Sequence, residues 1–266
     1  MKNLVLLLIA TTMICLGVVS AEADTFDEMI EKRQAAEKKE TEKSGEFKTY
    51  YDNKQVQTIE NYKDGKKDGV FKQYNKDGTL LVEENYKDGV KNGPVKAYHN
   101  NGRILVEGNY KNGKSDGTVR KCYDNGRLEG VWTDKDGVKE GLIKHYHKSG
   151  DLKWEVKARN GEFHGMLKTY LDGGSLKGEW IYVDGVKQGP AREYHVTGPL
   201  YREGTYKDDK LEGVVRTYYD SGEVRMEQTF KDGKQVSKTK YWNKKGEQTE
   251  KDTWGMQEAI KEELGL

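Results

Sequence analysis

Glycine returns every 24 residues along most of this chain, and this period constrains the fold more than any other feature. The first series is Gly45, Gly69, Gly93, Gly117, Gly141, Gly165, Gly189 and Gly213. A second series runs from Gly78 to Gly246 and a third from Gly65 to Gly233, with Asp209 as an exception in the third. Self-similarity at a fixed period of about 20–50 residues is the signature of a repeat architecture.

Many of these glycines follow aspartate or asparagine, which predicts tight turns. Asp77–Gly78 and Asp88–Gly89 are two-residue hairpin signals, because a type I′ turn needs positive φ at both residues. Alternating segments such as VFKQY and TLLVEENY lie between the turns and are typical of short antiparallel strands. We therefore predict an all-β repeat: a single-layer antiparallel β-meander solenoid of 24-residue hairpin units, with short terminal helices. The turn glycines are Gly65, Gly78, Gly89, Gly102, Gly126, Gly150, Gly174, Gly198 and Gly222.

Two-residue loops also set the register of each hairpin. The predicted opposite pairs are Lys72 with Glu83, Tyr86 with Lys91, and Glu84 with Gly93. One face then collects Phe71, Leu80, Val82 and Tyr86 with their equivalents, and the other collects Lys72, Tyr74 and Glu83. Opposite charges that face each other across strands stabilise a sheet, so the lysine and glutamate columns predict a structural ladder. Catalytic acid–base pairs are the less favoured interpretation, because surface ion pairs are common.

The composition excludes a thick core and argues against nucleic-acid binding. Apolar and charged residues each make up 34% of the chain, and the formal net charge is +1. A nucleic-acid binder would carry a strong basic excess. The 17 tyrosines against five phenylalanines predict many half-buried rings whose hydroxyls stay in contact with water.

The first residues have the pattern of a secretory signal peptide. An apolar run from Leu4 to Val19 precedes Ala21-Glu22-Ala23, which predicts removal of residues 1–23 and a protein that is exported, periplasmic or at the cell surface or secreted. A retained membrane anchor is the alternative, although the run is short for one. Cys122 would be the one cysteine of the mature chain, so no intramolecular disulfide is expected.

The remaining boundaries follow from the period and from the composition of the two ends. Residues 24–44 are highly charged and predict an N-terminal helix or linker, and residues 45–252 hold about nine repeats. Residues 253–266 carry apolar side chains at helical spacing, which predicts a C-terminal capping helix over the last strand edge.

The repeated unit resembles a known family. Units such as YKDGKKDGVFKQYNKDGTLLVEE are similar to the variant MORN repeat (membrane occupation and recognition nexus), which occurs in bacterial exported proteins and in proteins described as YwqK-family antitoxins. The resemblance covers about residues 45–252 and is clearest at 61–108 and 181–228. It implies a single-layer β-meander that contacts proteins, lipids or surfaces, without a catalytic residue.

No group of residues predicts catalysis, a cofactor or a metal. His99, His147 and His195 share one column but are 48 residues apart, about 19 Å along the sheet, which is too far to share one ion. His145 and His147 are expected on one face, and two ligands without a third are a weak metal signal. Cys122 occupies an aromatic column, and a packed thiol is favoured over a nucleophile.

The region between about residues 130 and 180 departs from the pattern. Asp134 and Ala158 replace the tyrosines of their column, and tryptophans appear at the same place. The candidate partner-contact residues are Trp132, Trp154, Trp180, Tyr146, Tyr170 and Tyr182. The tryptophans are expected on one face, with Trp132 and Trp180 opposite Gly141 and Gly189. They are either a platform for a ligand or structural rings that cover glycines, and packing favours the second interpretation.

The leading expectation is a non-enzymatic, exported repeat protein that binds or scaffolds a protein partner along its sheet. A toxin-neutralising or immunity-like protein is the first alternative, since the family includes proteins described as antitoxins. A membrane-surface lipid binder is the second alternative, because the basic column could contact anionic headgroups, although the facing glutamates would offset most of that field. The identity of the partner and the oligomeric state do not follow from the sequence.

Overall fold

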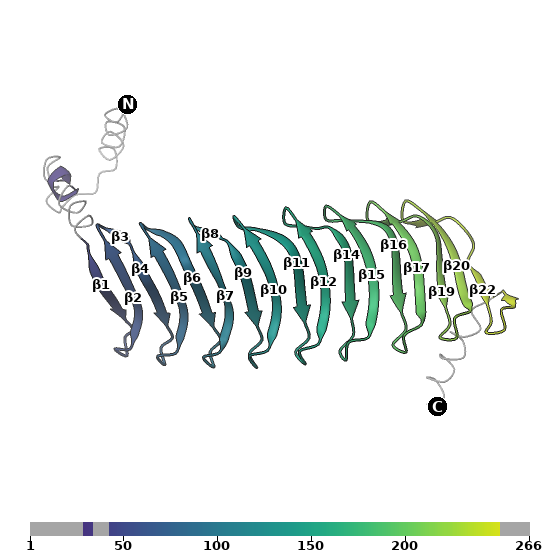
Figure 1. Cartoon of the computed structure of the whole chain (residues 1–266), viewed down its shortest axis with the longest axis horizontal. Helices are drawn as coiled ribbons and strands as arrows, with labels where there is room; N and C mark the ends of the chain where they lie inside the picture. The colour runs from purple at the N-terminus through teal and green to yellow at the C-terminus, as the bar shows by residue number, and fades with distance from the viewer. Residues whose placement is uncertain (1–28, 34–42, 251–266) are drawn as a thin grey trace, which may run out of the picture.

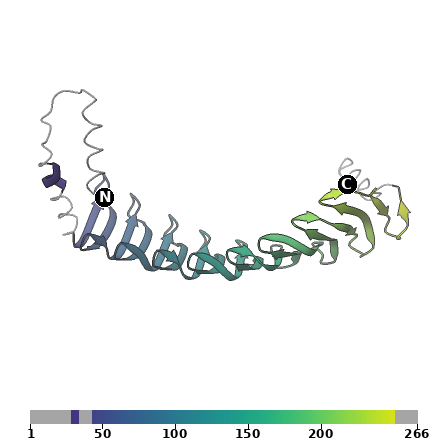
Figure 2. The ribbon, with the colours of Figure 1, turned by 90° about the horizontal axis from the view of Figure 1, so that it is seen from above.

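The described residues form one long, single-layer antiparallel sheet of 23 strands (Figure 1). The structure is a computed structural model, and it describes residues 29–33, which are helical, and residues 43–250. Each strand pairs with its neighbours in sequence, so the chain runs as a continuous meander. Seen from above, the ribbon of strands is twisted and curved along its length (Figure 2). The predicted β-meander repeat is confirmed.

The strands fall into long pairs and short extensions of them. The long strands are β1 (Gly45–Tyr50), β2 (Val56–Lys63), β4 (Gly69–Tyr74), β5 (Leu80–Lys87), β6 (Val90–Tyr98), β7 (Ile104–Lys111), β9 (Gly117–Cys122), β10 (Leu128–Lys135), β11 (Val138–Tyr146), β12 (Leu152–Arg159), β14 (Gly165–Tyr170), β15 (Leu176–Val183), β16 (Val186–Tyr194), β17 (Leu200–Lys207), β19 (Gly213–Tyr218) and β20 (Val224–Lys231). The short ones are β3 (Lys66–Lys67), β8 (Lys114–Ser115), β13 (Glu162–Phe163), β18 (Lys210–Leu211), β21 (Lys234–Gln235), β22 (Lys240–Trp242) and β23 (Gln248–Thr249).

The two turns of each unit differ in type. Asp88 and Gly89 both have positive φ, 50° and 84°, so the predicted type I′ turn is confirmed there. At the other end of the strand Gly78 has φ 86° but Asp77 is not left-handed, and the Gly78 N–H donates to Asn75 O. The type I′ prediction is therefore wrong for this turn. The same bond to the residue three before closes the turns at Gly102, Gly126, Gly150, Gly174, Gly198 and Gly222.

A β-bulge accompanies each of these second turns and preserves the expected register. The register shifts between Gln73 and Tyr74, and beyond this point Lys72 pairs with Glu83 as predicted. A left-handed glycine followed by a bulge is the next most common hairpin connection after the two-residue loop. The extra loop residue and the bulge offset each other, so the predicted assignment of side chains to faces holds.

The register around the type I′ turns is only partly as predicted. Tyr86 pairs with Lys91, but Glu84 pairs with Val95 and not with Gly93. Gly93, at φ 116°, pairs instead with Tyr110 of β7. The positive φ of this glycine lets the strand absorb two extra residues, which a two-residue loop count does not include. For the same reason Gly141 pairs with Ala158 and Gly189 with Tyr206, not with tryptophans.

Buried side chains gather on one face of the sheet, here named the aromatic face, which carries Phe71, Trp132 and Trp154. Ile143 and Val156 are only 2% and 1% exposed and form a cluster with Ala158. Val119, Ala191 and Val215 are also buried, and each precedes a charged residue of the opposite face. The opposite face carries Lys72 and Glu83 and is named the ladder face.

Several expectations concern residues outside the described part of the chain. The signal peptide (1–23) and the capping helix (253–266) lie wholly outside it, and the N-terminal helix or linker (24–44) lies mostly outside it. Within residues 29–33 and 43–250, no helix has the length and apolar character needed to cross a membrane.

Candidate functional site: an aromatic row and a charged ladder

A continuous row of contacting aromatic rings crosses the aromatic face in the irregular region. The imidazole of His145 stacks on the indole of Trp154 at 4.2 Å between centroids, and the ring of Trp132 lies parallel to His145 at 6.4 Å. Trp154 contacts Phe163 at 5.9 Å, and Phe163 meets Tyr182 edge-on at 5.7 Å. These five residues, the aromatic row, come from β10, β11, β12, β13 and β15.

The backbone register and one glycine place His145 in this row. His145 pairs with Gly130 on one side and with Trp154 on the other. A Cβ at Gly130 would lie 3.0 Å from His145 Nε2, so only a residue without a side chain leaves room for the imidazole. Trp132, Trp154 and Phe163 pack against the buried cluster of Ile143, Val156 and Ala158, so three rings of the row adjoin the best-buried part of the sheet.

Burial governs the electrostatics of the row. The pKa of His145 is lowered, first by burial of the ring, while the nearby carboxylate of Glu129 acts in the opposite direction. The neutral imidazole is therefore the form that suits stacking between two indoles. The Nζ of Lys139 lies 5.1 Å from the ring centroid of Trp132, which places a cation over one end of the row.

Trp180 lies on the same face but outside the row. Its ring packs over Gly178, where a Cβ would clash with two carbons of the indole. Trp180 pairs with Leu167 on one side and with Ala191 on the other. The expectation that tryptophans lie opposite Gly141 and Gly189 is wrong, but Trp180 does cover a different glycine.

The repeat pattern of the aromatic face breaks down beside Trp132. In regular units a lysine ammonium bridges a carboxylate and a ring, as Lys91 does with Glu84 at 2.6 Å and with Tyr110 at 5.5 Å. One unit further along, Gly108 replaces the acid, Ser115 the lysine and Asp134 the ring. Ser115 donates to Asp134 at 2.7 Å. A hollow of about 220 Å³ remains there, lined by these residues and by Trp132.

The opposite face carries one uninterrupted row of cross-strand partners. Along it, basic residues alternate with glutamates, and two apolar residues, Ile59 and Val131, take the place of acids. In order the ladder is Lys48, Ile59, Lys72, Glu83, Lys96, Glu107, Arg120, Val131, Lys144, Glu155, Lys168, Glu179, Arg192, Glu203, Arg216, Glu227 and Lys240. Ion pairs include Lys72–Glu83 at 3.0 Å and Arg216–Glu227 at 3.0 Å.

Tyrosines flank the ladder and bind its acids. The hydroxyl of Tyr218 donates to Glu203 at 2.6 Å, and burial together with this bond raises the pKa of Tyr218 to about 12. Tyr194 donates to Glu179 at 3.1 Å and Tyr170 to Glu155 at 3.4 Å. The candidate residues are therefore divided between faces. Tyr170 lies on the ladder face and Tyr146 holds the equivalent position there, whereas Trp132, Trp154, Trp180 and Tyr182 lie on the aromatic face.

The columnar histidines tie successive units together at the edge of the sheet. His99, His147 and His195 each bond through Nε2 to a backbone carbonyl 23 residues further on, at 2.9–3.0 Å. Tyr123 makes the equivalent bond to Tyr146 O. His147 therefore links two neighbouring turns, whereas His145 takes part in the ring contacts of the aromatic row. No group of three or more metal-ligating side chains occurs within residues 29–33 and 43–250.

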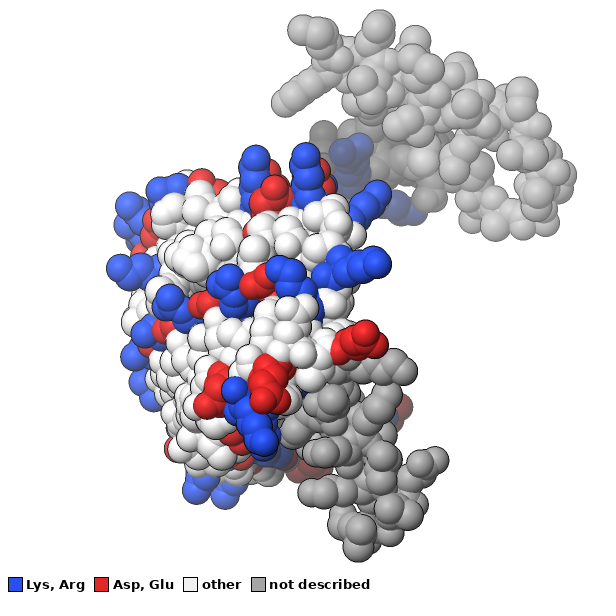
Figure 3. Space-filling model, turned by 90° about the vertical axis from the view of Figure 1, so that its right-hand side faces the viewer, with Lys and Arg blue, Asp and Glu red and all other residues white. Residues whose placement is uncertain are grey.

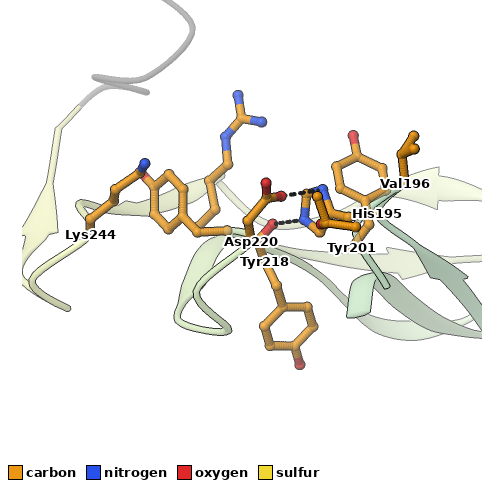
Figure 4. A pocket seen from close by; sticks show the side chains of 9 residues that line it. His195, Val196, Tyr201, Tyr218, Asp220 and Lys244 are labelled. Carbon is orange, nitrogen blue, oxygen red and sulfur yellow. Dashed lines mark hydrogen bonds and ion pairs between the residues drawn. The ribbon is translucent and has the colours of Figure 1, made fainter. Parts of the chain in front are cut away.

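A cavity of about 420 Å³ lies between the last of these turns (Figure 4). His195 bonds to Tyr218 O at 3.0 Å and to Asp220 at 2.7 Å, and its ring meets Tyr201 at 5.0 Å. Lys244 and Arg225 also line the cavity. These contacts hold the turns together.

Charges of both signs are interspersed on the surface of the array. Seen from the right-hand end of Figure 1, Lys and Arg side chains lie among Asp and Glu side chains, with uncharged areas between them (Figure 3). The alternation of the ladder is the structural cause of this mixing on the ladder face. A surface of this kind offers no broad field of one sign.

Comparison with protein families identifies the repeat. The MORN repeat variant matches residues 43–64, 67–88, 91–112 and 211–232. The chain therefore carries MORN-variant repeats at four places, and repeats of this kind generally bind proteins or lipids. Residues 113–210, between the third and fourth matches, contain the aromatic row together with Ser115 and Asp134, whereas Gly108 lies within the third match.

Other comparisons add little. No curated protein matches the chain. Among solved structures, TarM is 10% identical over 41% of this chain and 21% of its own, with a TM-score of 0.28. The accessory secretory protein 1, 2 and 3 structure from Streptococcus pneumoniae is 14% identical over 48% and 19%, with a TM-score of 0.17. A porin-like protein from Bacteroides uniformis is 10% identical over 72% and 92%, with a TM-score of 0.18. At these scores none of the likenesses bears on function.

The row contains two residues that sequence reasoning missed. His145 was considered for metal binding, and Phe163 was not singled out. The sequence signal that could have pointed to these positions is the set of glycines outside the 24-residue series. Gly108, Gly130, Gly178 and Gly204 would each bring a Cβ within 3.4 Å of a side chain on the same face. Such a glycine marks the place where a neighbouring large side chain needs room.

Proposed function

We propose that this protein is a non-catalytic, exported binding scaffold that engages a protein partner through the aromatic row. The observation that carries the proposal is the stack of Trp132, His145 and Trp154, continued by Phe163 and Tyr182. These rings are half-buried, and Trp132, Trp154 and Phe163 pack against the buried cluster, so they offer contact area at little cost in side-chain entropy. Clustered aromatic anchors of this kind dominate the energetics of protein interfaces.

The position of the row within the array supports this role. The regular units resemble one another, so a partner that contacted them would find no unique register along the sheet. The aromatic row occurs once among residues 43–250, where the repeat pattern is broken. A scaffold with one distinctive patch on a long regular frame would position one partner at a defined place. Export rests on the N-terminal sequence pattern.

Parallel affinity purification tests the proposal. The full chain, a Trp132→Leu/Trp154→Leu variant and a Tyr206→Leu/Phe230→Leu variant are compared as baits in extracts of the native cell envelope. Tyr206 and Phe230 lie on the aromatic face but outside the aromatic row. The proposal predicts one or more proteins captured by the first and third baits and lost with the second, with unchanged circular dichroism. Equal capture by all three folded baits would contradict it.

The two alternatives predict different results. A toxin-neutralising protein would capture a toxin and restore growth when the two are produced together in the same compartment. A membrane binder would sediment with anionic vesicles, yet the ladder glutamates offset its basic residues and weaken that attraction. The protein-binding scaffold is favoured because aromatic contact area, rather than charge, distinguishes the irregular region.

A further inference from the structure

The ladder face has a second distinctive place, at Val131, on the opposite side of the same strand that carries Trp132. Val131 lies between Arg120 of β9 and Lys144 of β11, where the repeat calls for a glutamate. The flanking strands place the two bases about 9.6 Å apart, since neighbouring strands are about 4.8 Å apart. The ladder therefore has two bases that face an apolar side chain instead of a shared carboxylate.

A third hydrogen-bond donor belongs to this place in the ladder, here named the gap at Val131. In three other units a tyrosine hydroxyl binds the glutamate 15 residues before it, as Tyr218 binds Glu203 at 2.6 Å. The same offset relates Tyr146 to Val131. No hydrogen bond of the Tyr146 hydroxyl occurs within the described part of the chain. By register and by the offset seen in those three units, two bases and a phenol belong to the ladder position from which the expected carboxylate is missing.

The two bases are only partly neutralised by other groups. Arg120 approaches Glu107 at 3.4 Å and Lys144 approaches Glu155 at 3.6 Å, which is longer than the 3.0 Å of Lys72–Glu83. The side chain of Arg120 is 54% exposed. Both bases are therefore reachable from solvent and retain capacity for one more acceptor each.

The other gap in the ladder shows that such a position leaves space. A hollow of about 260 Å³ lies at Ile59, lined by Lys72 and Tyr74 among others. There the chain supplies a substitute acid, because Glu46 binds Lys48 at 3.0 Å. At Val131 the residue equivalent to Glu46 is Thr118, which carries no charge. The gap at Val131 is the one that the chain does not fill with an acid of its own.

We propose that the gap at Val131 is a binding site for an acidic side chain of a protein partner. The partner's glutamate would take the place of the missing ladder residue, with its carboxylate between Arg120 and Lys144 and its aliphatic stem on Val131. The Tyr146 hydroxyl would donate to one carboxylate oxygen, as Tyr218 does to Glu203. Leu142, 46% exposed on the same face, supplies an adjacent apolar contact. This site is separate from the aromatic row, and its existence does not depend on the proposed function.

A carboxylate is favoured over a phosphate because the surrounding ladder already holds carboxylates in this arrangement. By register, each regular position pairs one glutamate with bases from both flanking strands, and at Glu155, Glu179 and Glu203 a tyrosine hydroxyl also donates to the carboxylate. One added carboxylate at Val131 would restore the alternation of bases and acids there, because Val131 and Ile59 are the two ladder positions at which an apolar residue replaces an acid. A lipid surface would instead meet glutamates on both sides of the gap.

Filling the gap from within tests the geometry of the site. Val131→Glu would complete the ladder, so its melting temperature is expected to exceed that of Val131→Gln, which has the same shape without the charge. The melting temperature of Ile59→Glu should exceed that of Ile59→Gln by a smaller amount, because Glu46 already binds Lys48. Equal melting temperatures for Val131→Glu and Val131→Gln would overturn the proposal.

Titration with a model ligand tests binding directly. The probe is N-acetylglutamate methylamide, followed by backbone amide shifts of the full chain, with the glutamine analogue as neutral control. The glutamate probe is expected to shift residues 118–122, 131 and 144–146, and Val131→Glu is expected to weaken this binding about tenfold. Shifts spread evenly along the ladder would overturn the proposal, as would tighter binding of inorganic phosphate or of phosphatidylglycerol vesicles at the same residues.

Discussion

His145 and Trp154 stack with 4.2 Å between their ring centroids and 12° between their planes. The contact joins β11 to β12 at the centre of the irregular region and links the two tryptophans into one row. It depends on Gly130, which leaves room for the imidazole. A ring that would be a titratable surface group in another context is here part of a packed surface.

Acid should loosen the aromatic row through His145. Burial lowers its folded-state pKa, so the unfolded chain binds this proton more readily. The contribution of His145 to stability is therefore complete above the unfolded pKa of about 6.5 and is lost as pH falls below it. We expect the free energy of unfolding to fall less steeply between about pH 7 and pH 5 in His145→Phe than in the unchanged chain. Urea titrations at each pH measure it, and identical slopes would refute this prediction.

Gly130→Ala should disturb the row without changing any charged group. The new Cβ would lie 3.0 Å from His145 Nε2, so the ring must move or the strands must separate. Overpacking of this kind costs about 1–3 kcal/mol. We expect a lower melting temperature and a red-shifted tryptophan emission. Unchanged values of both would show that the imidazole does not need this space.

The two turn types predict different effects on stability when the aspartate of the turn is replaced by glycine. Asp88 has φ 50°, so Asp88→Gly relieves a left-handed residue and should be neutral or slightly stabilising. Asp77 is not left-handed, and its carboxylate accepts a bond from Thr79 N at 2.8 Å, so Asp77→Gly should destabilise by about 1 kcal/mol. Thermal unfolding of both variants measures the difference. An equal loss in both would mean that the turns are alike.

Tyr218 should titrate unusually late because it is partly buried and bonded to Glu203. Its pKa is raised to about 12, so the folded state resists the loss of this proton. Stability should therefore fall as pH rises above the unfolded pKa of about 10. Glu203→Gln removes the charged acceptor and should lower the pKa of Tyr218, as followed by ultraviolet difference spectra. A titration curve that does not change in this variant would contradict the assigned bond.

The period of the glycines was enough to predict the meander, the strand pairs and the two faces. The pairing of Lys72 with Glu83 was predicted although its turn was assigned the wrong type, because the loop residue and the bulge offset each other. The predicted pairing of Glu84 with Gly93 is wrong, because the strand accommodates two extra residues at the left-handed Gly93. Local turn signals carry no information on such irregularities.

The candidate site was less predictable than the fold. Trp132, Trp154 and Trp180 were expected on one face and lie there, but the stack also needs His145 and Phe163. Their role depends on which residues meet across strands, and that follows from the bulges. Tyr146 and Tyr170 were grouped with the tryptophans, although alternation along the strand places them with the ladder.

Site-specific photo-crosslinking tests the central claim, that the aromatic row is the surface that a protein partner contacts. A benzophenone amino acid replaces Phe163 in the row or Phe230, which lies on the same face near the C-terminal end, and the full chain is irradiated in its native envelope. The account predicts a discrete crosslinked protein from the Phe163 position and none from the Phe230 position. Crosslinks of equal yield at both positions, or at Phe230 alone, would contradict it.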